Sequence, residues 1–130
     1  MSTFNAIGVA GTGVTVYRKW LDAVSDNIAN MDNVSRTSEN AFQARYVVAQ
    51  QAQDGNGAQV GGIAYGSAEG RLSYEPDNPM ADTEGYVRRP DIDLGSQMAQ
   101  MIMAQRAYQA NLLVVDRARD SYSAAINLGK

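Results

Sequence analysis

Residues 6–31 read AIGVAGTGVTVYRKWLDAVSDNIANM, and apolar side chains recur along this stretch every seven residues. Such a repeat is typical of a helix that packs along one stripe against another helix. Asn5 stands where it can cap the start of the helix, and the polar run that begins at Asn30 marks its end. The sequence therefore predicts a long helix with a coiled-coil-like seam. The two apolar rows are Ile7, Val14, Leu21 and Ile28, and Ala10, Tyr17, Val24 and Met31.

Three glycines weaken the first half of this predicted helix. Gly8, Gly11 and Gly13 each cost about 1 kcal/mol relative to alanine in a helix interior. Their spacing superficially resembles a phosphate-binding loop, but no buried strand precedes them and no Gly-Lys-Ser/Thr follows. We therefore interpret them as glycines on a helix surface, and we expect the first two turns to depend on a packing neighbour.

A second helical pattern runs from Leu94 to about Leu128. Asp91 and Asp93 place negative charge at its start, where it suits the helix dipole, and Gly129 supplies a stop signal. The predicted helix spans roughly 50 Å. Its seven-residue row consists of Leu94, Met101, Tyr108, Val115 and Tyr122, flanked by Met98, Leu112 and Ile126 on one side and by Ala104, Ala118 and Ala125 on the other. Gln105 and Arg119 interrupt this seam, and Met103 lies off it, as a candidate contact to another chain.

The segment between the two helices predicts a small β element. Residues 32–40 are polar and read as a loop. Two β-prone runs, 42–51 and 60–65, flank the turn signal Asp54-Gly-Asn-Gly57, which predicts a hairpin. Leu72-Ser-Tyr74 adds a candidate strand, and the two prolines in the following acidic stretch predict a turn over 75–79.

The predicted fold class is therefore α+β, with two long terminal helices forming a coiled-coil-like pair and a small β-hairpin element between them. We expect three segments: a terminal helix in residues 1–35, a loop and β element in residues 36–90, and a second terminal helix in residues 91–130. Two helices of this length carry more apolar surface than so small a β element can cover. Surplus apolar surface indicates partners.

The composition excludes several classes of function. The net charge is -3, from 14 acidic and 11 basic side chains, so no broad basic field is available for nucleic acid. The chain has no histidine and no cysteine, which removes the commonest general base and all thiolate chemistry. No stretch is apolar enough to span a bilayer, and the N-terminus does not read as a cleaved signal peptide. We expect no cofactor and no direct membrane span.

Six carboxylates cluster between the second half of the β element and the start of the second helix. Their spacing does not match the calcium-loop template, and no matched acid and nucleophile of a glycosidase is apparent among them. We interpret them as solvated turns and a helix start, and we expect no metal site and no catalytic site. They are Glu75, Asp77, Asp82, Glu84, Asp91 and Asp93.

Several motifs resemble those of the rod and hook proteins of the bacterial flagellum. VSDNIAN at residues 24–30 resembles the N-terminal helix motif of that family, and RAYQAN at 106–111 is similar to its C-terminal helix motif. YEPDNPMADTEGYV at 74–87 and PDID at 90–93 resemble the segment particular to the short proximal-rod type, and the closing INLGK at 126–130 also fits.

The resemblance implies a structural, non-enzymatic subunit of the basal-body rod, whose terminal helices build a tubular shaft that transmits motor torque. It also implies export through the flagellar secretion apparatus without a cleaved signal peptide, localisation in the flagellar basal body, and contact with copies of itself and with other rod proteins. The predicted subunit interface consists of Ile7, Val14, Tyr17, Leu21, Val24, Asn27, Ile28, Asn30, Met98, Met101, Tyr108, Asn111, Leu112, Val115 and Tyr122.

Some alternatives remain open from the residues alone. Asn27 and Asn30 are suited equally to capping the helix end and to hydrogen bonding between subunits. The first alternative function is an amphipathic-helix module that binds a partner or a membrane, which predicts a basic polar face. The long helix instead mixes Asp116 and Asp120 with two arginines. A hydrolase, the second alternative, is disfavoured by the missing histidine and cysteine.

Overall fold

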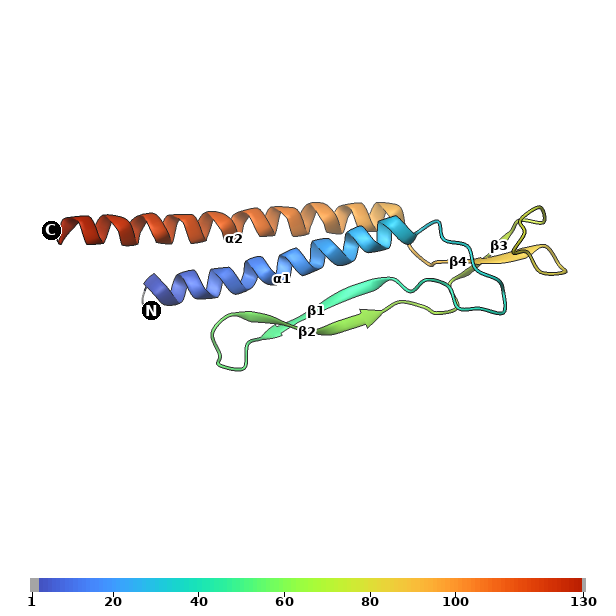
Figure 1. Cartoon of the computed structure of the whole chain (residues 1–130), viewed down its shortest axis with the longest axis horizontal. Helices are drawn as coiled ribbons and strands as arrows, with labels where there is room; N and C mark the ends of the chain where they lie inside the picture. The colour runs from blue at the N-terminus through green and yellow to red at the C-terminus, as the bar shows by residue number, and fades with distance from the viewer. Residues whose placement is uncertain (1–2, 130) are drawn as a thin grey trace. The chain divides into compact units, whose positions relative to one another are not determined.

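The computed structural model describes residues 3–129, and it places two long helices at the ends of the chain with four strands between them in sequence (Figure 1). Two separate two-stranded sheets pair β1 with β2 and β3 with β4. The α+β class with two long helices and a small β part is confirmed. The elements are α1 (Thr3–Asn30), β1 (Arg45–Gln51), β2 (Ala58–Tyr65), β3 (Arg71–Tyr74), β4 (Tyr86–Arg89) and α2 (Leu94–Leu128).

The ends of the helices follow local signals in the sequence. Helix α2 begins and ends where the pattern predicts, and the Asp93 carboxylate caps it by accepting a hydrogen bond from the Ser96 amide at 2.7 Å. Helix α1 ends at Asn30 as expected, but it begins at Thr3. The prediction that Asn5 caps α1 is therefore wrong, because Asn5 already lies within the first turn.

The predicted hairpin is present as β1 and β2, but the strand expected near Leu72 pairs with a strand that the sequence pattern did not predict. Strand β4 is antiparallel to β3, with Ser73 opposite Val87 and Tyr74 opposite Tyr86. The sequence pattern did not predict β4 because two of its four residues are arginines. A run this short with two charged residues does not show the apolar alternation of a strand. The middle of the chain thus holds two β ribbons rather than one.

The chain divides into two compact units, each built from separate stretches of sequence. Unit 1 consists of Met1–Leu21, Val47–Gly62 and Ile102–Lys130, and unit 2 consists of Asp22–Tyr46 and Ile63–Met101. The predicted division into segments 1–35, 36–90 and 91–130 remains a prediction, and residues 1, 2 and 130 of it lie outside the described residues.

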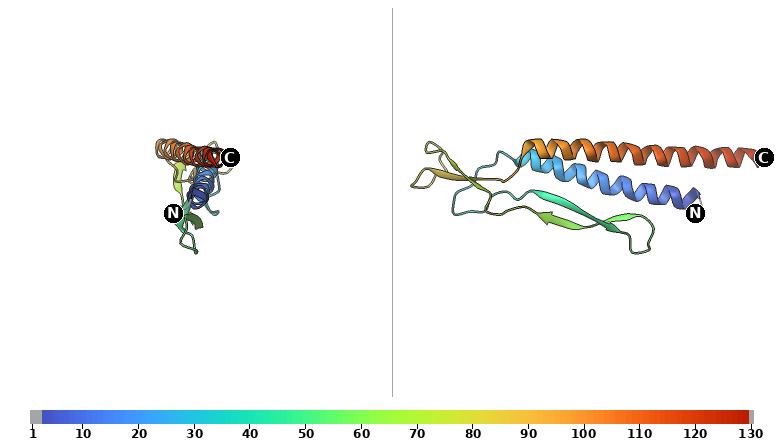
Figure 2. Two further views of the ribbon diagram at one scale, coloured as in Figure 1. Left: turned by 90° about the vertical axis from the view of Figure 1, so that its left-hand side faces the viewer. Right: turned by 180° about the vertical axis from the view of Figure 1, so that it is seen from behind.

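In unit 1, helix α1 packs against α2 on one side and against the β1–β2 hairpin on another (Figures 1 and 2). The rings of Phe4 and Tyr122 meet edge to face at 4.7 Å between centroids. Farther along, a Cβ on Gly13 would lie 2.8 Å from the Asn111 side chain, so the absence of a side chain there permits the close approach. Gly8 and Gly11 face open space instead.

The hairpin is anchored to α1 through Thr12. Its hydroxyl donates a hydrogen bond to the Val9 carbonyl at 2.6 Å and accepts one from the Ala58 amide at 3.1 Å. Gly57 has a φ of 97°, and a side chain at that position would clash with the Thr12 hydroxyl. A turn with a left-handed glycine therefore sets how closely the hairpin approaches the helix.

In unit 2, buried apolar side chains come from α1, from β4 and from the segment before α2. Val24 and Val87 are almost completely buried, together with Pro90 and Ile92. Ser35 and Arg88 exchange two backbone hydrogen bonds of 2.9 Å, which join the loop after α1 to strand β4. These bonds cover the free edge of β4. On the faces of the ribbon, Val87 is buried whereas Tyr74 on the opposite face stays 64% exposed.

Two carboxylates of the acidic cluster in unit 2 have defined partners. Asp82 accepts hydrogen bonds from the amides of Tyr86 and Glu84, both at 2.9 Å, and these bonds lower its pKa, the Tyr86 bond most. Glu75 accepts a bond from the Arg89 guanidinium at 2.6 Å. That bond, helped by one from Asn78, lowers the pKa of Glu75 to about 2.

We expect Glu75→Gln to lower the urea midpoint of unfolding at pH 7 and to leave it almost unchanged near pH 2. The folded pKa of Glu75 lies below its ordinary value of 4.5, so its contribution to stability is fully present above pH 4.5 and is lost as the pH falls toward 2. Asp77→Asn, on an exposed carboxylate of the same turn, serves as the control. If the difference in urea midpoint between wild type and Glu75→Gln stays constant from pH 7 to pH 2, the ionised Glu75 carboxylate is not the source of the stability.

Candidate assembly interface

The residues predicted to form a subunit interface are distributed unevenly over the surface of the chain. Val24 and Asn27 are buried within the chain. Met98, Leu112 and Tyr122 remain exposed, at 51%, 37% and 38%. The other ten are partly exposed: Ile7, Val14, Tyr17, Leu21, Ile28, Asn30, Met101, Tyr108, Asn111 and Val115. Part of the predicted seam is therefore buried within the chain, and much of it remains accessible to solvent.

Asn27 has a role that neither sequence interpretation included. Its amide nitrogen donates to the Arg45 carbonyl at 2.9 Å and to Gln97 Oε1 at 3.0 Å, while its Oδ1 accepts from the Arg45 amide at 2.8 Å. Asn27 is fully buried and Gln97 is 2% exposed. The side chain of Asn27 therefore joins three segments of unit 2, namely α1, the start of β1 and the first turn of α2.

The other two asparagines of the prediction make local contacts. The Asn30 side chain donates to the Asp26 carbonyl at 2.8 Å and accepts from the Asn33 side-chain amide at 2.9 Å, so both of these contacts lie at the end of α1. Asn111 donates to the Ala107 carbonyl at 3.0 Å on its own helix. Its amide faces Gly13 across the helix pair of unit 1.

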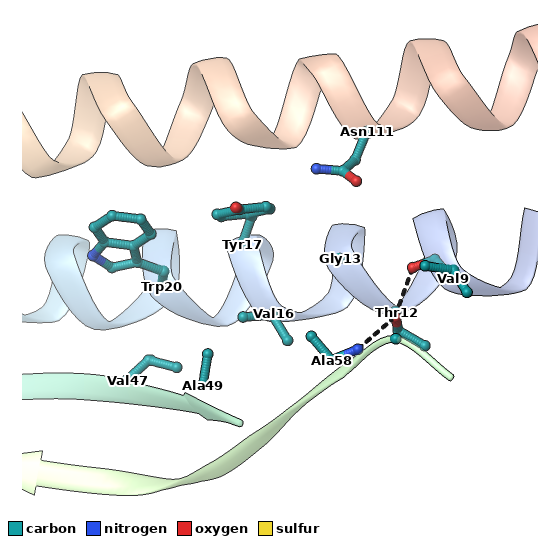
Figure 3. Close-up of a pocket in the computed structure, with 11 residues that line it drawn as sticks. Val9, Thr12, Gly13, Val16, Tyr17, Trp20, Val47, Ala49, Ala58 and Asn111 are labelled. Carbon is teal, nitrogen blue, oxygen red and sulfur yellow. Dashed lines mark hydrogen bonds between the residues drawn. The ribbon is translucent and has the colours of Figure 1, made fainter. Parts of the chain in front are cut away.

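Unit 1 also contains an apolar groove of about 510 Å³ between α1, the hairpin and α2 (Figure 3). Val16 points toward strand β1 on one side, and the stacked rings of Tyr17 and Trp20 lie on the side of α2, with centroids 6.1 Å apart. No carboxylate, lysine or arginine lines the groove. Its lining is mainly apolar, with Thr12, Tyr17, Trp20 and Asn111 as the polar or amphipathic side chains.

Helix α2 carries unpaired apolar surface in unit 1. From Leu112 to Leu128 not one described residue is buried. A surface helix of a monomer shows one apolar stripe, whereas α2 in unit 1 also exposes apolar side chains away from its seam with α1. They include Ile102, Met103, Leu113, Val114 and Leu128, which are between 50% and 89% exposed. Exposed apolar surface of this extent is typical of a protein interaction site.

The described part of the chain shows no cluster of three or more metal-ligating side chains among residues 3–129. In the same range, neither helix has a stretch of sufficient length and hydropathy to span a bilayer.

Comparison with known proteins gives a consistent result. Residues 83–128 match the family model described as flagellar basal body rod FlgEFG protein C-terminal. Relatives described as flagellar basal-body rod protein FlgC align over the whole of both chains. They are 34% identical in Yersinia enterocolitica, 31% in Salmonella typhimurium and 27% in Bacillus subtilis.

The two long helices, the accessible seam and these matches together define a structural subunit of the bacterial flagellar rod. Within that class, the chain belongs to the FlgC family of flagellar basal-body rod proteins. The resemblance stated from its motifs is thereby confirmed, and so is the predicted localisation in the flagellar basal body. Membership of this family implies that other flagellar proteins are its neighbours.

We expect Asn27→Ala to lower the free energy of unfolding by about 3 kcal/mol, because it leaves the Arg45 amide and the buried Gln97 side chain without their partner. Urea unfolding followed by circular dichroism measures the loss. Asn33→Ala, at an exposed position just after the same helix, should cost less than about 0.5 kcal/mol. Equal stability of the two variants would mean that the Asn27 cluster does not hold unit 2 together.

Proposed function

We propose that this rod subunit assembles through its two terminal helices, which pack against neighbouring subunits to form the tubular shaft and transmit torque through packed side chains. The observation that carries the proposal is the unpaired apolar surface of α2 in unit 1. Burying apolar surface is favourable by about 25 cal/mol of free energy per Å². The exposed apolar side chains of the helices therefore supply a driving force for association. The predicted interface residues are the contacts through which it acts.

The activity is structural rather than enzymatic. No carboxylate, lysine or arginine lines the apolar groove, and in unit 2 Asp82 is engaged in a turn and Glu75 is paired with Arg89. The absence of histidine and cysteine from the sequence agrees with this. Membrane binding by an amphipathic helix is not favoured, because Asp116 and Asp120 interrupt the basic side chains of α2.

In the proposed assembly, different segments of the chain occupy different parts of the rod. We assign residues 1–35 and 91–130 to the inner, load-transmitting part of the shaft and residues 36–90 to a part that projects outward. Copies of the chain and other rod proteins are the neighbours, and export proceeds through the flagellar secretion apparatus without a cleaved signal peptide. Secretion of the chain by cells with and without that apparatus tests the export route.

The interface is tested by Leu112→Asp, which should block incorporation into the rod and abolish swimming. Leu112 is already 37% exposed in the free chain, so the carboxylate costs the fold little. In a dry interface an unpaired ion costs several kcal/mol. The measurement is the amount of the subunit in isolated basal bodies, together with motility, in cells that have no other copy of the protein.

Gln109→Asp is the matched control, since it places the same charge on an exposed position of α2 outside the apolar rows. Circular dichroism and an export assay on both variants separate loss of folding or secretion from loss of assembly. Normal rods built from Leu112→Asp would refute the assignment of this seam. If Gln109→Asp reduces incorporation as much as Leu112→Asp does, α2 is buried on nearly all sides in the assembled rod.

A further inference from the structure

The two units of the chain carry opposite charge. Unit 1 contains six basic and three acidic side chains, a net charge of +3, and unit 2 contains five basic and eleven acidic side chains, a net charge of -6. The overall charge of -3 conceals this difference. A contact between the same surface of two copies would bring like charges together, whereas a contact between unit 1 of one copy and unit 2 of another is attractive.

On unit 1, one face of α2 combines positive charge with apolar side chains. Met103, Arg106, Ala110, Leu113 and Arg117 follow one another at intervals of three and four residues, so they share a face of the helix. All five are exposed. The series contains no acidic residue up to Arg117 and is followed by Asp120, one turn farther along the helix. Neither arginine forms an ion pair with a described residue. We call this surface the α2 stripe.

The α2 stripe includes a shallow groove. Leu113, Val114 and Arg117 line it together with Ala118 and Ser121, and its volume is about 360 Å³. Leu113 is 61% exposed and Val114 is 50% exposed. A partner that fits the stripe therefore needs an apolar side chain for the groove and carboxylates for the two arginines.

Unit 2 presents a segment with that combination. The connection between β3 and β4, residues 75–85, holds Met80, which is 43% exposed, between the exposed carboxylates of Asp77 and Glu84. No ion pair joins either carboxylate to a described residue, in contrast to Glu75, which binds Arg89. The connection is also held in a fixed shape by the Asp82 hydrogen bonds and by the Asn78 side chain, which accepts from the Met80 amide at 3.0 Å.

We propose that the α2 stripe of one copy binds the β3–β4 connection of a second copy, with Met80 against Leu113 and Val114 and with Asp77 and Glu84 facing Arg106 and Arg117. The proposal rests on the assembly function proposed above and names one contact within it. Two different surfaces meet, so the contact is heterologous: it leaves an unused stripe on one copy and an unused connection on the other, and it can be repeated without limit or closed into a ring.

Engineered cysteines test the contact directly in assembled rods, because the native chain contains no cysteine that could give a background. Met80→Cys and Leu113→Cys are produced as two differently tagged copies in the same cells, and basal bodies are isolated and mildly oxidised. We expect a disulfide-linked product that carries both tags and has about twice the 14.0 kDa mass of the chain. Each single variant expressed alone should give at least about tenfold less dimer.

The outcomes separate this contact from the proposed function. Cysteine variants found in basal bodies without a mixed dimer would overturn the contact and leave the function intact. Strong dimers from one variant alone would show a symmetric contact and also overturn it. Cross-linking only to a different rod protein would mean that this protein, and not a second copy of the chain, occupies the site, and would overturn the contact. Absence of the wild-type chain from basal bodies would contradict the proposed function itself.

A charge exchange provides the second measurement and does not depend on disulfide geometry. Arg106→Glu/Arg117→Glu makes both surfaces acidic, and Asp77→Arg/Glu84→Arg makes both basic, so each variant alone should enter basal bodies at least about tenfold less than wild type. Expressed together, the two variants should recover incorporation, because each then offers the other a complementary surface. Full incorporation of either variant alone, or no recovery by folded variants together, would refute the contact.

Discussion

The buried amide of Asn27 is the interaction on which unit 2 depends. Its three hydrogen bonds join α1, the start of β1 and the first turn of α2, segments that are up to 70 residues apart in sequence. A buried amide must find all its partners at the same time, or the unpaired groups cost about 1 to 3 kcal/mol each. The cluster therefore fixes the relative register of the two helices in this unit more sharply than interchangeable apolar contacts would.

The parts of the fold that could be predicted are those with a local or periodic cause. The seven-residue rows and the Asp93 cap were sufficient to place α2, and the Asp54–Gly57 turn was sufficient to place the β1–β2 hairpin. The role of Asn27 was not predictable, because an asparagine near a helix end has the same local surroundings whether it caps, binds a neighbour or is buried. Strand β4 was not predicted because its two arginines break the apolar alternation of a strand, and because its pairing with β3 joins residues that are distant in sequence.

The candidate interface was predictable in kind but not in detail. Sequence periodicity identified which residues share a face of a helix, and motifs identified the family. Neither could show that α1 is contacted on two sides, with Val16 toward β1 and Tyr17 toward α2. The hairpin takes up a second face of α1 that the rows did not include, and Thr12, which anchors it, appeared in the sequence only as a polar residue between glycines.

The chain is stabilised unequally along its length, and this follows from what each unit buries. Unit 2 buries Val24 and Val87 almost completely, whereas in unit 1 Gly8 and Gly11 face open space and the last turns of α2 have no buried residue among those described. Ordering a helical residue costs about 1 to 2 kcal/mol of backbone entropy, which packing must offset. The chain itself supplies little packing at these ends, and in the assembly proposed above neighbouring subunits supply it. On that proposal, helix order in unit 1 and assembly of the rod are coupled, because the same apolar surface serves both.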